Sequence, residues 1–159
     1  MIQDGLTASQ AAIQTDLAEL KAAVDALEPG TGGPACGPGT AVGRFVINGS
    51  EACDTRTGLK WQQVPDLTPR NHANAGAYCD SLGGGYRLSA IQELFSMLDY
   101  AQYNPALTPG VFSNINVLGF YWSVTSAAFD SNIAWLVRME LPAVPPAPKS
   151  DPYNVLCVR

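Results

Sequence analysis

Charged residues are scarce in this sequence, and basic residues form no cluster. Only 14% of its 159 residues are charged, against roughly 25% in soluble domains in general, and the net charge is −5. Binding to phosphates requires concentrated lysine and arginine, so the composition excludes nucleic acid as a partner. No apolar run approaches the ~20 residues that span a bilayer, so we do not expect the chain to cross a membrane.

Residues suited to catalysis are also scarce. His72 is the single histidine, no Gly-x-Ser-x-Gly motif is present, and no phosphate-binding glycine loop leads into Lys-Ser or Lys-Thr. The carboxylates are scattered, and we interpret Glu93 and Asp99 as surface charge. Because no nucleophile stands with a base, we expect a protein without enzymatic activity.

The four cysteines are Cys36, Cys53, Cys79 and Cys157, and none belongs to a Cys-x-x-Cys pair. Zinc ligands usually arrive in close pairs, so this pattern favours two disulfides over a metal site. Cys36 lies near Cys53 in the sequence, and we expect these two to close a small loop, although the count alone allows three pairings. Disulfides indicate an oxidising setting, namely an extracellular, periplasmic or virion-surface one.

Apolar residues in the segment 1–28 recur with the heptad spacing that is typical of a coiled coil. Six residues form this seam: Leu6, Ile13, Leu17, Leu20, Val24 and Leu27. Gln10 is the one polar residue at a seam position and can set the register. We predict a helix that joins copies of the chain, as a parallel homotrimer. The alternative is a single amphipathic helix that lies on the domain.

Proline and glycine dominate residues 29–43, which we interpret as a linker between this helix and a domain over residues 44–159. Residues 44–47 predict a strand that ends at the tight-turn pair Asn48-Gly49. Residues 54–61 predict a turn into a second strand, with Trp61 facing the core.

Two short helices are predicted next. The first begins at Thr68 and Pro69, a cap followed by proline at the first helical position, and it contains Cys79. The glycines at 83–85 let the chain turn sharply, because glycine adopts positive φ at little cost. The second helix begins at Ser89, which we expect to form a capping pair with Gln92. Its apolar face contains Ile91, Leu94, Phe95 and Leu98.

Strands and loops follow the helices. Residues 100–119 predict a long loop, because their proline, glycine and asparagine pairs interrupt regular structure. Residues 120–125 predict a strand, and the period of two in residues 133–141 predicts a half-buried strand. Residues 142–152 are rich in proline and predict an irregular excursion, whereas residues 153–159 predict a final strand. We expect Trp61, Trp122 and Trp135 in the core.

Six short segments occur in an order that resembles a known family. They are Asp-Thr-Arg-Thr-Gly-Leu-Lys-Trp (54–61), Ala-Tyr-Cys (77–79), Tyr-Arg-Leu (86–88) with Glu-Leu (93–94), Tyr-Trp-Ser (121–123), Ala-Trp-Leu-Val (134–137) and Leu-Cys-Val-Arg (156–159). The match resembles the family typified by the C-terminal domain of bacterial collagen-like adhesins. That family has a C-type-lectin-like fold, so the resemblance implies an α+β domain with two short helices, antiparallel sheets and long loops. The family usually has Asp-Trp-Arg-Leu-Pro where this chain has Gly-Tyr-Arg-Leu-Ser at 85–89.

The resemblance also implies roles for single residues. In lectin-like folds a cysteine of the first helix bonds to one of the last strand, which implies Cys79–Cys157 and leaves Cys36–Cys53. Arg87 is implied to be a buried or half-buried donor in a structural ion pair. The reactive cysteine pair of the related formylglycine-generating oxidase is absent, and so are the calcium-binding triplets of animal lectins. We expect no cofactor; calcium, without a recognisable motif, is the one candidate left.

Lectin-like folds present ligands on irregular loops, which here are residues 100–119, 126–132 and 142–153. Aromatic and small polar residues on these loops suit stacking on a sugar or gripping a protein. They are Tyr100, Tyr103, Asn114, Asn116, Asp130, Asn132 and Tyr153. The alternative is that each is an ordinary solvated loop residue.

We therefore predict a non-enzymatic recognition or adhesion module at a cell surface, a virion surface or another extracellular site. It would bind a glycan or a host-surface protein as a homotrimer, which raises avidity. The alternative is a structural virion or filament component, such as a decoration or fibre-tip protein, whose N-terminal helix docks into a larger assembly. The start of the chain lacks the cationic and apolar blocks of a signal peptide, which favours the alternative unless a leader has been removed.

Overall fold

The computed structural model describes residues 36–103, 105–140 and 143–159. The predicted coiled coil lies outside the described residues, and its oligomeric state therefore stays a prediction. The described elements are, in chain order, β1 (Thr40–Val42), β2 (Phe45–Asn48), β3 (Glu51–Asp54), β4 (Lys60–Gln62), α2 (His72–Ser81), β5 (Arg87–Leu88), α3 (Ile91–Ser96), β6 (Phe120–Ala127), β7 (Asp130–Arg138), β8 (Pro146–Pro148) and β9 (Cys157–Val158).

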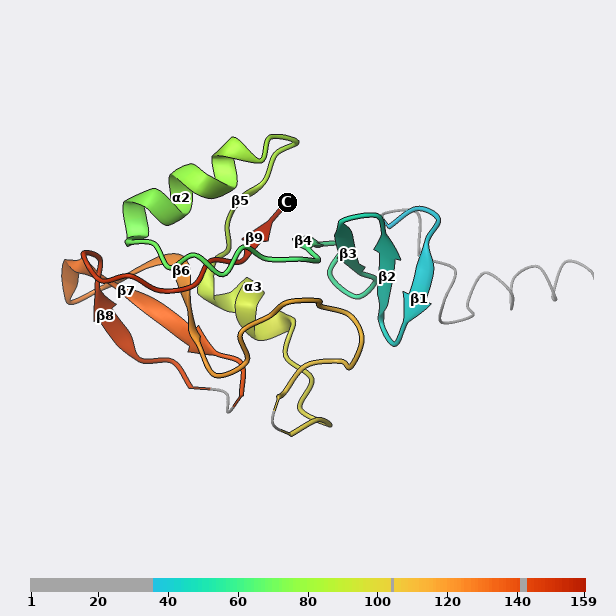
Figure 1. Cartoon of the computed structure of the whole chain (residues 1–159). Helices are drawn as coiled ribbons and strands as arrows, with labels where there is room; N and C mark the ends of the chain where they lie inside the picture. The colour runs from blue at the N-terminus through green and yellow to red at the C-terminus, as the bar shows by residue number, and fades with distance from the viewer. Residues whose placement is uncertain (1–35, 104, 141–142) are drawn as a thin grey trace, which may run out of the picture.

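The strands form two sheets, and two short helices pack beside them (Figure 1). The larger sheet has the order β1-β2-β3-β4-β9-β5, and the smaller one has the order β6-β7-β8. All strand pairs within the two sheets are antiparallel. The domain is thus a mixed α and β structure, as the sequence predicts.

The first three strands form a meander held by tight turns. Asn48 pairs with Glu51, so the turn between β2 and β3 consists of Gly49 and Ser50, one residue later than predicted. Gly49 has φ +59°, and a glycine at the first turn position suits a two-residue hairpin. β1 lies inside the segment that the sequence predicts to be only a linker, because Thr40–Val42 pairs with β2.

α2 begins at His72, and the predicted start at Thr68 and Pro69 is wrong. The side chain of Asn71 accepts a hydrogen bond from the backbone N–H of Asn74 (2.9 Å) and caps the helix. Arg70 is held in a β-bridge by Tyr153 and so cannot join the helix. The exit from the helix agrees with the sequence, since the glycines at 83–85 all have positive φ.

α3 begins at Ile91, and the predicted capping pair of Ser89 with Gln92 is wrong by one residue. Ser89 is fully buried, and its hydroxyl donates to the carbonyl of Leu156 (3.1 Å) instead. The carboxylate of Glu93 accepts a hydrogen bond from the backbone N–H of Ala90 (2.7 Å), which completes one half of a capping box.

Two apolar cores lie on opposite faces of the β6–β7 pair, because successive side chains of a strand point to opposite sides. The loop-side core contains Phe45, Ala52, Trp61, Leu94, Met97, Leu98, Ala106, Leu107, Val111, Tyr121, Val137, Met139, Leu156 and Val158. The α2-side core contains Ala75, Cys79, Leu88, Trp122, Ala134, Leu136, Ala147, Val155 and Cys157. β7 is therefore covered on both faces, and the prediction of a half-buried strand is wrong.

The three tryptophans do not share one environment. Trp61 and Trp122 are fully buried, as predicted. Trp135 is only half-buried, and its ring packs edge-on against the exposed ring of Phe129 at 6.3 Å between centroids. The period of two correctly places Trp135 on the same side of β7 as Val137. The core elements that cover Val137 do not extend as far as Trp135.

The proline-rich segment after β7 contains a strand that the sequence did not predict. In β8, Ala147 pairs with Ala134 of β7, and one proline stands on each side of it, at positions 146 and 148. Because hydrogen-bonding groups alternate in direction along a strand, the prolines have their nitrogens on the free edge. Proline lacks an N–H group, so it is tolerated on an edge strand and blunts that edge against further pairing.

β9 lies in the interior of the larger sheet. Val158 pairs with Trp61 of β4 on one side and with Arg87 of β5 on the other. The strand is only two residues long, so the predicted final strand over 153–159 is shorter than expected. Cys157 in β9 bonds to Cys79 in α2, and Cys36 bonds to Cys53 in β3. These are the pairs that the resemblance implies.

Candidate binding site

A pocket of about 370 Å³ opens in the long segment between α3 and β6. Figure 1 shows this segment, in yellow to orange, beside α3 and on the side away from α2. Most of its lining is apolar. The lining residues are Gln102, Tyr103, Pro105, Leu107, Thr108, Pro109, Gly110, Phe112, Ile115 and Val117.

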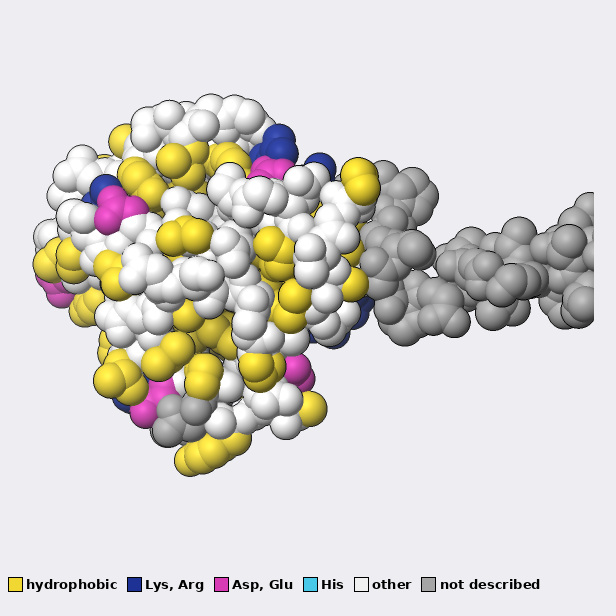
Figure 2. All heavy atoms as spheres, turned by 45° about the vertical axis from the view of Figure 1, so that its right-hand side comes forward, with side chains coloured by type: hydrophobic (Ala, Val, Ile, Leu, Met, Phe, Trp, Pro, Cys, Tyr) yellow, Lys and Arg dark blue, Asp and Glu magenta, His cyan; other side chains and the backbone are white. Residues whose placement is uncertain are grey.

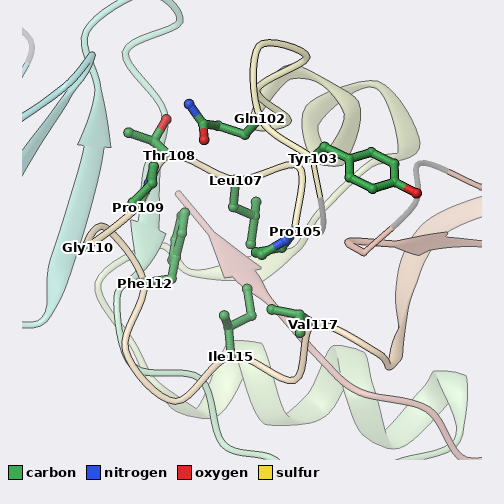
Figure 3. Close-up of a pocket in the computed structure, with 10 residues that line it drawn as sticks. All are labelled: Gln102, Tyr103, Pro105, Leu107, Thr108, Pro109, Gly110, Phe112, Ile115 and Val117. Atoms are coloured by element: carbon green, nitrogen blue, oxygen red, sulfur yellow. The ribbon is translucent and has the colours of Figure 1, made fainter.

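The side chains of Leu107, Phe112, Ile115 and Val117 converge on the pocket (Figure 3). The ring of Tyr103 points away from them and lies at the rim. In the space-filling view, hydrophobic side chains are spread over this face of the molecule (Figure 2), and some lie at its lower end, at the height where Figure 1 places the loop. The loop thus exposes part of the apolar surface that it contributes to the fold.

The first half of the loop is held against the end of β7. The backbone N–H of Ala106 donates to the carbonyl of Met139 (3.0 Å), and the N–H of Asp99 donates to the carbonyl of Ala106 (3.0 Å). The carboxylate of Asp99 accepts hydrogen bonds from the N–H of Ala101 (3.1 Å) and the hydroxyl of Thr108 (3.3 Å). Ala106 and Leu107 are buried as a result, so this part of the loop belongs to the core.

A tight turn forms one wall of the pocket. Thr108, Pro109, Gly110 and Val111 form the turn, in which the N–H of Val111 donates to the carbonyl of Thr108 (3.4 Å). Gly110 has φ +80°, and proline followed by glycine at the two central positions is the signature of a type II turn. The turn packs against the β1–β2 connection: a Cβ atom on Gly43 would lie 2.8 Å from the methyl group of Thr108.

The second half of the loop is tied to β4 and to the segment after it. The backbone carbonyl of Gln63 accepts from the N–H of Ser113 (3.1 Å), and its side-chain amide donates to the carbonyl of Val111 (3.0 Å) and the hydroxyl of Ser113 (3.2 Å). The side chain of Asn114, a residue with φ +57°, donates to the carbonyl of Pro65 (3.3 Å). These bonds hold the loop in one conformation although it has no regular structure.

Tyr121 supports the loop from the core. Its hydroxyl accepts a hydrogen bond from the backbone N–H of Asn116 (2.8 Å). Burial raises the pKa of Tyr121 to about 12, while the bond from Asn116 opposes this rise. The phenol therefore stays neutral at physiological pH and serves as a structural contact rather than an acid or base.

The pocket offers little chemistry beyond apolar contact. None of the ten lining residues that the structure describes is charged. Among the residues that the structure describes, no group of three or more histidine, cysteine or carboxylate side chains is placed to hold a metal ion. No helix within the described ranges is both long and apolar enough to cross a bilayer.

The structure does not bring the predicted ligand-binding residues together. Tyr103 lines the pocket and is 80% exposed, and Tyr100 is 69% exposed nearby in the chain. Asn114 and Asn116 are exposed in the same loop, where their polar groups hold the backbone. Tyr153 is half-buried, and its ring lies nearly perpendicular to that of Trp122 with centroids 5.1 Å apart, so it takes part in the packing of the α2-side core.

Asp130 and Asn132 lie at the other end of the β6–β7 hairpin. β6 leads away from the loop for eight residues, which is roughly 25 Å of extended chain. The carboxylate of Asp130 accepts a hydrogen bond from the N–H of Asn132 (2.8 Å), and the carbonyl of Asn132 accepts one from the N–H of Lys149 (2.8 Å). These two residues therefore shape the hairpin and do not share a site with Tyr103.

Sequence reasoning missed the apolar residues of the pocket. It interpreted residues 100–119 as an irregular ligand-presenting loop and selected its aromatic and polar members, whereas Leu107, Phe112, Ile115 and Val117 form the cavity. A signal was present, because a solvated loop does not need so many branched and aromatic side chains. Their spacing follows neither a helix nor a strand, so periodicity could not reveal the shared cavity.

Arg87 forms an ion pair as the resemblance implies, but it is not buried. Its guanidinium lies 2.7 Å from the carboxylate of Glu93, and its side chain is 48% exposed. Hydrogen bonding to Arg87 lowers the pKa of Glu93, and the same contact raises the pKa of Arg87. Glu93 is thus a half-buried partner of both Arg87 and the start of α3, rather than a free surface charge.

Comparison with known proteins identifies the family. No curated protein matches the chain. A family model described as the Lcl C-terminal domain matches residues 51–159, which include the whole pocket lining and three of the four cysteines. Because this match covers more than half of the chain, the protein belongs to the Lcl C-terminal domain family.

Proposed function

We propose that this domain is a recognition module that binds its ligand at the pocket of the loop between α3 and β6. Family membership indicates a surface adhesin-like module. The two disulfides agree with an extracellular location. Our proposal locates the ligand-binding site in the pocket, and the pocket itself is the observation that supports it. Binding residues are commonly held on loops by a rigid scaffold.

The proposal includes a C-type-lectin-like architecture and a homotrimer. The architecture is supported by two short helices, antiparallel sheets, a long loop and a disulfide from the first described helix to the last strand. The trimer is supported by the heptad seam in residues 1–28. Light scattering of the full chain tests the trimer: replacing Leu20 and Leu27 together by aspartate should yield a monomer. An unchanged mass would reject the seam as the oligomer contact.

The binding role is tested with the full chain on two arrays, one of neutral and acidic glycans and one of purified cell-surface and matrix proteins. Val117→Glu places a carboxylate in the apolar pocket, whereas Leu118→Glu places the same charge on a neighbouring side chain that is 61% exposed and does not line it. We expect Val117→Glu to reduce the signal at least tenfold and Leu118→Glu to leave it unchanged. No signal for the wild type, or equal signals for both variants, would reject the pocket as the site.

A second pair of variants tests the same site at exposed residues, because Val117→Glu could also disturb folding. Tyr103 lines the pocket rim, while Tyr100 is similarly exposed and lies outside the lining. Neither ring is buried, so replacing either by alanine should leave the unfolding midpoint unchanged. We expect Tyr103→Ala to weaken array binding and Tyr100→Ala to have the smaller effect. The reverse order would place the ligand elsewhere on the loop.

A further inference from the structure

We infer that the pocket accepts an uncharged, apolar side chain of a partner protein rather than a sugar ring, an inference that rests on the recognition role proposed above. The lining decides between these two ligands. Its interior side chains are those of Leu107, Phe112, Ile115 and Val117, with Pro105 and Pro109 beside them. A sugar hydroxyl buried against these groups would lose its hydrogen bonds to water without replacement, which opposes binding.

The polar groups of the lining are either engaged or at the rim. The hydroxyl of Thr108 already donates to Asp99, and the carbonyl of Thr108 accepts from Val111. The two other polar side chains of the lining belong to Gln102 and Tyr103, which are both exposed. Sugar sites place several polar groups so that they meet successive hydroxyls, whereas the described lining residues offer unengaged polar side chains only at the edge.

The two aromatic rings of the lining, Phe112 and Tyr103, are placed differently. Phe112 is half-buried, and its ring packs edge-on against Phe45, with centroids 5.8 Å apart. The ring of Tyr103 points away from the other lining side chains (Figure 3). A branched or aromatic side chain can contact Phe112 and its aliphatic neighbours without leaving any polar group unpaired.

Charge narrows the ligand further. The described lining residues carry no charge of either sign, so a charged group of a ligand would be buried without a partner, and the chain has a net charge of −5. Sulfated, phosphorylated and polyanionic ligands would meet neither a salt bridge nor a favourable field. The segment that enters the pocket is therefore neutral as well as apolar.

The pocket has the size and rigidity for a single anchoring residue. Its volume of about 370 Å³ lies at the lower end of the roughly 300–1,000 Å³ of ligand pockets. The loop is held by hydrogen bonds from the side chain of Gln63 and to the carbonyls of Pro65 and Met139, so little ordering is required on binding. One buried aromatic or aliphatic side chain in such a pocket is the usual centre of a protein–protein contact.

The test uses the full chain labelled with ²H and ¹⁵N and followed by TROSY NMR. Probes are the N-acetyl amides of phenylalanine, leucine and tryptophan, compared with N-acetyl serinamide and with methyl glycosides of glucose and N-acetylglucosamine. We expect the apolar amides to shift the backbone signals of Leu107, Phe112, Ile115 and Val117 saturably, with Kd on the order of 1–10 mM. The shifts should disappear in Val117→Glu and persist in Leu118→Glu.

The outcomes separate this inference from the proposed function. Saturable shifts from a methyl glycoside without shifts from the apolar amides would overturn the inference and retain the pocket as a glycan site. No shift from any probe would also overturn it, while array binding that depends on Val117 would still support recognition. Binding of the apolar amides with no ligand on either array would support the pocket chemistry and reject the proposed function.

Discussion

The two faces of the β6–β7 pair are closed by different means. On the α2 side, a ten-residue helix and the bond between Cys79 and Cys157 cover the sheet, and the indole N–H of Trp122 donates to the carbonyl of Arg70 (2.8 Å). On the loop side, the core is closed by residues of the larger sheet, by α3 of only six residues and by the irregular loop that follows α3. The first closure is largely regular and covalent, and the second depends on dispersed hydrogen bonds.

The position of the pocket follows from this difference. A helix places its side chains at regular heights, so it can fill the grooves of a sheet with few gaps. The loop places Leu107, Phe112 and Ile115 at irregular intervals. These apolar side chains pack in or against the core, and they also leave the pocket between them. The face with the weaker local structure is thus the one that offers a binding site.

Removing the covalent closure should have the largest effect. The bond between Cys79 and Cys157 spans 78 residues, and the bond between Cys36 and Cys53 spans 17. In the chain-entropy model the double variant Cys79→Ala/Cys157→Ala should lose about 4 kcal/mol of unfolding free energy, against about 3 kcal/mol for Cys36→Ala/Cys53→Ala. Guanidinium unfolding of both variants measures the difference. A larger loss for the shorter bridge would show that the α2 side does not depend on its covalent closure.

The two buried tryptophans allow a matched comparison of the cores. Trp122 is hydrogen-bonded on the α2 side, whereas the indole nitrogen of Trp61 on the loop side has no partner among the described residues. Trp122→Phe should therefore cost about 1 kcal/mol more than Trp61→Phe, because only the first loses a hydrogen bond. Both should cost roughly 1–3 kcal/mol through lost packing. Equal losses in chemical unfolding would mean that this bond contributes nothing measurable.

The loop closure can be weakened without altering the cores. Gln63→Ala removes the side-chain bonds to Val111 and Ser113 and keeps the backbone bond to Ser113. We expect a loss of about 1 kcal/mol and faster amide hydrogen exchange in residues 105–119, with α2 unaffected. Gln62→Ala is a useful control, since its amide bonds to Tyr78 of α2 instead. Equal exchange in both variants would contradict the loop's dependence on Gln63.

The smallest effect concerns pH on the α2 side. Burial lowers the pKa of His72 below its ordinary value of 6.5, the bond to the carbonyl of Ser123 opposes this, and the charge of Lys149 lowers it further. His72 therefore takes up a proton more readily in the unfolded chain than in the folded one. The contribution of neutral His72 to the free energy of unfolding is complete above about pH 6.5 and decreases as the pH falls below it.

The matched variant for this titration is His72→Gln, which keeps a donor near Ser123 and cannot be protonated. Between pH 7.5 and 5.5 the melting temperature of the wild type should fall more than that of the variant. The carboxylates titrate in both proteins, so the difference isolates His72. A larger fall in the variant would reverse the assigned direction of the shift.

Local signals predicted much of the fold. The hairpin at Gly49 follows from glycine at a tight turn, and the exit from α2 follows from three glycines that adopt positive φ. β7 follows from a period-two pattern, and β6 is predicted as a strand over residues 120–125. The disulfide pairs came from family resemblance, because four cysteines alone allow three pairings.

Tertiary contacts decided the features that the sequence did not show. Serine is a residue type that commonly caps helices, but the hydroxyl of Ser89 donates to the carbonyl of Leu156, which lies 67 residues away. β8 consists of two prolines around Ala147, and only the neighbouring β7 makes that segment a strand. The pocket likewise depends on Met139 and Gln63, which bring distant parts of the loop together. None of these partners lies within a local window.

The place of β9 has a consequence for biosynthesis. The strands on either side of it, β4 and β5, leave the ribosome long before Cys157 and Val158, so the larger sheet is completed only when the last elements have been made. Cys36, Cys53 and Cys79 meet any oxidant before the fourth cysteine exists. Premature bonding of Cys79 to either earlier cysteine would trap a chain that cannot close. A chain oxidised during its synthesis would therefore need a disulfide isomerase to reach the two native pairs.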